Sequence, residues 1–161
     1  MKEVREINRK IVVIGAFVIL SVLFLMPSAA FANKMDVAFA GTNITFENIV
    51  IIPLGDKALH HFDITGEMTG DIEGSFVWIE DRIWTLNDDG TMDSAKVEVT
   101  CEVTTAAGTV VIAIKHKLLT EDGPFVSKSG RWMIIGGTGL MSTLSGSGTF
   151  IFPFQFEGKI K

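Results

Sequence analysis

The sequence predicts an all-β domain of roughly eight antiparallel strands, arranged as a sandwich or a barrel. Three observations predict this class. Apolar and polar residues alternate with a period of two along most of the chain, which is the spacing of a strand that buries one face. Turn-forming Gly, Pro, Asn and Asp residues recur every 8–15 positions. No apolar run of the domain fits the helical period of about 3.6 residues better than a period of two.

An N-terminal segment precedes this domain and has the three-part pattern of a secretory signal peptide. Residues 1–32 carry four basic side chains, then a 16-residue apolar run at 11–26, then small residues before a cleavage point after Ala32. We therefore expect the β domain to span 33–161 and to be exported to an extracellular, periplasmic or cell-surface location. An uncleaved membrane anchor is the alternative, although the apolar run is shorter than the ~20 residues that a membrane span needs.

The first half of the domain contains four predicted strands and one strong turn. Residues 43–52 and 58–65 alternate apolar with polar positions, and each is followed by Pro or Gly, which stop strand pairing. Residues 74–80 and 82–86 are rich in aromatic and β-branched side chains, which favour strands. The "NDDG" stretch at 87–90 then predicts a tight turn.

The second half of the domain contains four further predicted strands. In the first, at 96–105, Val97, Val99, Cys101 and Val103 alternate with Glu and Thr. One apolar and one polar face are typical of an antiparallel sheet. The remaining predicted strands follow Gly-containing turns and span 109–119, 130–137 and 148–160.

The last predicted strand carries a phenylalanine at every second residue: Phe150, Phe152, Phe154 and Phe156. In one continuous strand the four rings share a face and span about 20 Å. Pro153 lies on the opposite face and predicts a sheet edge or a bulge, because proline donates no backbone hydrogen bond. The rings are expected to face a packed core, a bound ligand or another subunit. Three tryptophans could contribute to any of these: Trp78, Trp84 and Trp132.

Two glycine-punctuated stretches carry a family resemblance: "GDIEGS" at 70–75 and "GRWMIIGGTGLMSTLSGSGTF" at 130–150. They resemble motifs of the allene-oxide-cyclase-like and dirigent-like β-barrel superfamily, with its uncharacterised bacterial or archaeal relatives. The resemblance implies a single antiparallel eight-stranded, calycin-like barrel whose hydrophobic cavity binds or steers small apolar molecules. It also implies frequent trimers. The matching positions are Gly, Thr and Leu, so the resemblance assigns no catalytic residue.

The predicted ligand cavity is lined by aromatic side chains and one cysteine. These residues are Phe150, Phe152, Phe154, Phe156, Trp78, Trp132 and Cys101. His60 and His116 are the candidate polar or catalytic groups, because each shares a strand face with apolar residues. The alternatives are histidines satisfied within a core, or a strand end that reaches solvent. His61 points to the face opposite His60, so this adjacent pair cannot ligate one metal ion.

Charge and composition argue against several functional classes. Residues 33–161 hold 10 Lys and Arg against 17 Asp and Glu, a net charge of about −7, so nucleic acid is a poor partner. No membrane contact is expected beyond the N-terminal segment. The "GGTG" at 136–139 lacks the third glycine and the lysine of nucleotide-binding loops, and no cofactor is predicted. Glu67, Asp71 and Glu73 could bind a cation but fit a solvated outer face better, so no metal site is predicted.

These features lead to one functional hypothesis and two alternatives. The hypothesis is an exported small β-barrel that binds a small hydrophobic ligand in its barrel cavity, without catalysis. The first alternative is a cyclase or isomerase of the allene-oxide-cyclase type, which acts on an apolar substrate in the same cavity with His60 or His116 as its polar group. The second is a structural or assembly protein with a filled core. A homo-oligomer, a trimer by the resemblance, is the expected assembly.

Overall fold

The computed structural model describes residues 34–120 and 125–161, with the backbone only for residues 125–129. The predicted signal segment lies outside these residues, so its cleavage stays a prediction. The described chain forms eight strands and one short 3₁₀ helix. They are β1 (Met35–Pro53), β2 (Lys57–Gly70), β3 (Gly74–Leu86), β4 (Met92–Thr105), β5 (Gly108–Thr120), β6 (Phe125–Gly137), η2 (Gly139–Met141), β7 (Gly146–Ile151) and β8 (Gln155–Ile160).

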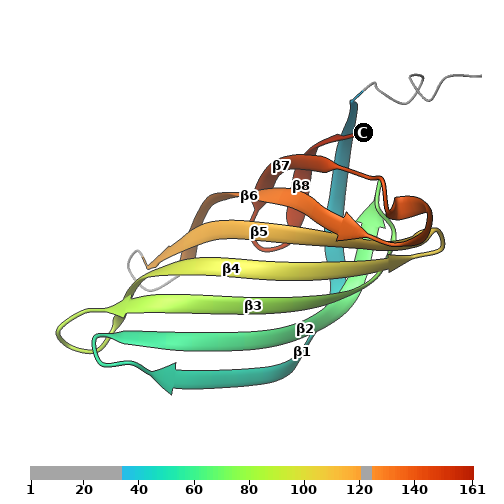
Figure 1. Ribbon diagram of the computed structural model, residues 1–161. Coiled ribbons are helices and arrows are strands. Elements are labelled where there is room, and N and C mark those ends of the chain that lie inside the picture. The colour runs from blue at the N-terminus through green and yellow to red at the C-terminus, as the bar shows by residue number, and fades with distance from the viewer. Residues whose placement is uncertain (1–33, 121–124) are drawn as a thin grey trace, which may run out of the picture. The chain divides into compact units, whose positions relative to one another are not determined.

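The eight strands form one closed antiparallel ring (Figure 1). Each strand pairs with its neighbours in sequence, and β8 returns to pair with β1. This confirms the predicted all-β, single antiparallel eight-stranded barrel. Within the described part of the chain, no helix is long and apolar enough to cross a membrane.

Two predicted divisions between strands were wrong, and the two errors offset each other in the count of eight. β1 and β6 also begin earlier than predicted, at Met35 and Phe125. Residues 74–80 and 82–86 form one strand, β3, because Asp81 pairs in unbroken register with His61 on β2 and Glu98 on β4. In contrast, residues 148–160 are divided into β7 and β8. A charged residue inside an alternating run therefore marks an outward position here, and not the end of a strand.

The four phenylalanines do not lie on one continuous strand, as the sequence had predicted. Phe150 lies in β7 and faces Phe156 of β8 across the hairpin. Phe152 and Phe154 flank Pro153 in the turn between the two strands. Pro153 thus occupies a turn, not an edge or a bulge, because a residue without an N–H stops the strand pairing there. The rings still gather on the inner side of the barrel, since hairpin partners share a face.

Glycines on β7 and β8 make room for the largest ring of the core. A Cβ atom on Gly148 would lie 2.7 Å from Nε1 of Trp132, and one on Gly158 would lie 2.6 Å from the Cζ2 of the same ring. Trp132 is fully buried, and its Nε1 donates a hydrogen bond to the Glu157 carbonyl at 3.0 Å. The glycine spacing in this part of the sequence therefore serves the packing of Trp132 where β7 and β8 close the barrel.

The ring is closed over only part of its height, because β7 and β8 are much shorter than the other strands (Figure 1). β1 pairs with β8 over Met35–Ala40, and β6 pairs with β7 over Gly130–Met133. Beyond these residues β1–β6 continue without β7 and β8, and we call this part the open half. There, residues 42–53 of β1 pair with β2 along one edge and leave their other edge unpaired within the described chain.

Candidate functional site

Polar side chains cross the inner face of the barrel close to the end of β7. His60 on β2 is in register with Arg82 on β3, Arg82 with Val97 on β4, and Val97 with His116 on β5. Both histidines are buried, each with 7% of its surface exposed. The inward placement that alternation predicted for His60 and His116 is therefore confirmed. We call His60, Glu80, Arg82 and His116 the inner polar cluster.

Glu80 and Arg82 form an ion pair inside the barrel that the sequence analysis missed. Glu80 is 2% exposed, and one carboxylate oxygen accepts a hydrogen bond from Trp78 Nε1 at 2.8 Å. Its other oxygen accepts a hydrogen bond from Arg82 Nε. The Arg82 guanidinium also lies 4.3 Å from the centre of the Phe62 ring, a cation–π contact. The available signal was alternation, which places Glu80 and Arg82 on the same face as Trp78 and Trp84.

His116 is buried without the hydrogen bonds that a buried imidazole needs. Within the described residues, neither Nδ1 nor Nε2 of its ring has a hydrogen-bond partner. The ring contacts Phe150 and Phe152, with centroids 5.0 Å and 6.1 Å away. Gly130 lets β6 approach, since a Cβ there would lie 2.5 Å from that of His116. An unsatisfied buried polar group costs about 1–3 kcal/mol, so this arrangement needs a physical explanation.

Burial sets the charge state of His116. It lowers the pKa of the imidazole below its ordinary value of 6.5. The nearby Glu80 carboxylate opposes this shift, Arg82 adds to it, and the Lys117 backbone opposes it through an interaction that does not meet the geometry of a hydrogen bond. The ring is therefore neutral near neutral pH, with one nitrogen as donor and the other as acceptor.

His60 has a comparable environment, and its neighbour His61 has a different one. Burial, and then the charge of Arg82, lower the pKa of His60, whose ring lies 6.1 Å from that of Trp84. His61 points outward, and its Nδ1 lies 2.7 Å from Asp81. A hydrogen bond with Asp81 is the main cause that raises the pKa of His61. The two adjacent histidines thus occupy opposite faces, as predicted.

The residues predicted to line a ligand cavity all lie on the inner side, and most of them pack on one another. The rings of Phe150 and Phe156 are 5.2 Å apart, and those of Trp78 and Phe154 are 5.0 Å apart. Phe152 and Phe154, in the β7–β8 turn, are only half-buried, and Phe152 contacts His116. That these rings contact a ligand stays a prediction. The members with almost no exposed surface are Trp78, Trp132, Phe150, Phe156 and Cys101.

Cys101 behaves as an inert core residue. It is fully buried on β4, and burial raises the pKa of its thiol to about 12. The thiol is therefore protonated near neutral pH and is a poor nucleophile.

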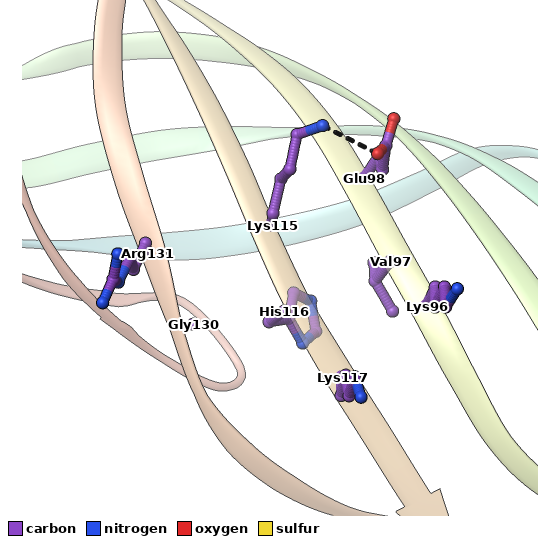
Figure 2. Close-up of a pocket in the computed structure, with 8 residues that line it drawn as sticks. All are labelled: Lys96, Val97, Glu98, Lys115, His116, Lys117, Gly130 and Arg131. Carbon is purple, nitrogen blue, oxygen red and sulfur yellow. Dashed lines mark hydrogen bonds and ion pairs between the residues drawn. The ribbon is translucent and has the colours of Figure 1, made fainter.

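A hollow of about 460 Å³ lies on the outer face of β4–β6, and His116 and Gly130 are among the residues that line it (Figure 2). The net charge of about −7 argued against a basic surface, but the fold gathers four cations from three strands here. Glu98 also lines the hollow and forms an ion pair with Lys115 at 2.8 Å. The four cations are Lys96, Lys115, Lys117 and Arg131.

The carboxylates considered as a cation site serve the fold instead. Asp71 accepts a hydrogen bond from the Ala38 backbone N–H at 2.7 Å, and Glu67 accepts one from the Asn43 side chain at 2.7 Å. Among the residues that the structure describes, no group of three or more His, Cys, Asp or Glu side chains is placed to hold a metal ion.

Comparisons with protein-family models, with curated proteins and with solved structures give no match to this chain. The resemblance to allene-oxide-cyclase-like and dirigent-like barrels therefore stays a prediction from the quoted motifs.

Proposed function

We propose that this protein is an exported barrel that binds a small, mainly apolar molecule on its inner face, next to His116, without transforming it. The observation that carries the proposal is the buried His116 ring, whose two nitrogens lack partners among the described residues. A ligand with one hydrogen-bonding group could supply the missing bond, while its apolar part contacts Phe150 and Phe152. Such a bond contributes about 0.5–1.5 kcal/mol, on top of the apolar burial.

Apolar side chains on the inner face of β1 support the same location. Ile49 is in register with Phe62, and Ile51 with His60, so both point to the side that holds the inner polar cluster. Although they face inward, Ile49 and Ile51 are 55% and 60% exposed, because β7 and β8 do not extend opposite them. Covering such surface contributes about 25 cal/mol per Å², which favours an apolar occupant.

Phe152 is the side chain that a ligand would contact or displace on its way to His116. It is half-buried in the β7–β8 turn, with its ring 6.1 Å from the imidazole. Turns move more readily than paired strands, since fewer backbone hydrogen bonds hold them. Phe152 is thus placed to admit a ligand and then to pack against it.

The first experiment is native mass spectrometry of residues 33–161, purified without detergent, followed by binding of the fluorescent probe 1-anilinonaphthalene-8-sulfonate. We expect the native mass spectrum to show a small molecule that stays bound to the protein. Otherwise we expect the fluorescent probe to bind, and an organic extract of the protein to displace it. Phe152→Ala should weaken probe binding about tenfold or more, because a buried ring contributes about 1.5–3 kcal/mol. Val77→Ala, on the outer face of β3, is the matched control. A chain that retains nothing and binds no probe would favour the filled-core alternative.

One observation favours catalysis as a second candidate function. Burial favours the neutral form of His116, and among the described residues neither of its ring nitrogens has a hydrogen-bond partner, so one nitrogen is free to accept a proton as a general base does. A cyclase or isomerase would lose turnover in His116→Ala while it still bound its substrate. A binding protein would show a modest loss of affinity in that variant and no turnover in either form.

A further inference from the structure

A row of outward side chains crosses the strands at the place where the barrel closes. Lys115 on β5 is in register with Arg131 on β6, and Arg131 with Thr149 on β7. Thr149 is in turn in register with Glu157 on β8. Cross-strand partners share a face, so the row runs cation, cation, hydroxyl, carboxylate. We call the outward residues of β6, β7 and β8 around Thr149 the β7 face.

Arg131 and Glu157, on either side of Thr149, carry opposite charges. Among the side chains that the structure describes, neither has an ion-pair partner, whereas the neighbouring Lys159 on β8 is paired with Asp36 at 3.2 Å. Figure 2 shows that Arg131 points away from the Lys115–Glu98 pair. Arg131 and Glu157 lie two strand spacings apart, about 10 Å, with Thr149 between them. The row is therefore positive on one side of Thr149 and negative on the other.

The centre of the β7 face is hollowed on both sides of β7. A hollow of about 650 Å³ lies on the side of Arg131 and Met133, and one of about 540 Å³ lies on the side of Asp71 and Glu157. Gly148 and Thr149 line both hollows. Met133, which points outward beside this centre, is 53% exposed. Met133 and Arg131, which line the larger hollow, are of the two non-aromatic residue types that are enriched in protein interfaces.

We propose that the β7 face docks a second copy of this chain through a twofold axis that runs parallel to β7 above Thr149. This rotation exchanges the two sides of the face, so Arg131 of each copy meets Glu157 of the other. Two identical ion pairs form. Met133 of each copy lies opposite Lys159 of the other, since both are in register with Ser147, and the apolar stem of the lysine can cover it. A twofold contact uses the same surface on both copies, which requires the surface to be complementary to itself. The order of charges along the row meets that requirement.

The test is sedimentation equilibrium of residues 33–161, from about 1 to 300 μM. This range covers weak association, which is expected of a contact that buries little surface. R131E places two carboxylates at each contact, and E157R places two cations there. Each variant should raise the dimer Kd about tenfold or more, because like charges at a contact oppose association. A 1:1 mixture of the two variants should restore dimers, since every contact again joins opposite charges.

Matched controls separate the β7 face from general charge effects and from misfolding. Glu102→Arg on β4 and Lys57→Glu on β2 change exposed residues by the same charge and should leave the dimer Kd within about threefold of the wild type, since neither residue lies on β6, β7 or β8 and their distance from the face leaves them screened. Circular dichroism of each variant checks that it folds. A monomeric wild type, a trimer, or a dimer that R131E and E157R leave unchanged would each overturn the proposal. So would a mixture that stays monomeric.

Discussion

At the scale of single residues, the inner polar cluster is the least expected feature of this protein. Besides the two histidines, a buried carboxylate and a partly buried guanidinium lie in a barrel filled by aromatic and aliphatic side chains. Glu80 is held by two donors, Trp78 and Arg82, so its burial is compensated. His116 lies in the same row and has no such compensation among the described residues. This contrast is why we place the ligand's polar group at His116.

Removal of Arg82 should destabilise the fold strongly. Arg82→Ala leaves the Glu80 carboxylate buried without its charged partner, and breaking such a pair costs about 3–5 kcal/mol. Lys115→Ala removes the exposed pair with Glu98 and should cost less than about 1 kcal/mol. Urea unfolding of the two variants measures both values. Equal costs would contradict the view that burial makes the Glu80–Arg82 pair important.

The three histidines should titrate apart from one another. His61 should have a pKa above 6.5, and His60 and His116 should have pKa values below it. The stability that His61 contributes is present below pH 6.5 and is lost as the pH rises through its raised pKa. The contribution of the two buried rings is present above pH 6.5 and is lost as the pH falls through their lowered pKa values. NMR titration measures all three, and Asp81→Asn should lower only the pKa of His61.

At the scale of elements, β1 and β6 border the opening left by the short β7 and β8, and half of β1 has one edge unpaired within the described chain. Bulges interrupt its register with β2 between Thr42 and Thr45 and again between Phe46 and Asn48. From Asn48 to Pro53 the register is continuous and the side chains are apolar, apart from Asn48. An uncharged, regular edge strand is a template for unwanted pairing between chains.

A charge on this edge should reduce aggregation without a loss of stability. Ile52 points outward and is 45% exposed, so Ile52→Lys removes little buried surface and should change stability by less than about 0.5 kcal/mol. Light scattering of concentrated samples on heating should show slower aggregation than the wild type. Ile64→Lys, at a fully buried position of β2, should instead unfold the domain. Unchanged aggregation of Ile52→Lys would show that the edge is protected in some other way.

At the scale of the whole molecule, two short strands close the ring, and glycines decide whether they can. A Cβ on Gly148 would lie 1.9 Å from the Glu157 carbonyl oxygen, in addition to its clash with Trp132. The same Cβ on Gly136 would meet no atom within 4 Å. The closure therefore depends on particular glycines, and others are replaceable.

Gly148→Ala should consequently destabilise the barrel, and Gly136→Ala should not. Overpacking of this kind costs about 1–3 kcal/mol or more, and the loss of β7–β8 pairing would open the ring. Gly136→Ala should be neutral within about 0.5 kcal/mol. Thermal unfolding of both variants, with hydrogen exchange of the β7 and β8 amides, tests this. Normal amide protection in Gly148→Ala would show that the strands can shift to accept the methyl group.

The sequence by itself determined which segments are strands and which side chains point inward, because alternation is a local property of a strand. It therefore placed His60, His61 and His116 on their correct faces, and it could have placed Glu80 there too. Only the tertiary structure decided that the chain turns at Pro153 and that β8 meets β1, because strand pairing depends on hydrogen bonds between residues far apart in sequence. The same pairing brings Arg131 and Glu157 to either side of Thr149, a juxtaposition that no local pattern records.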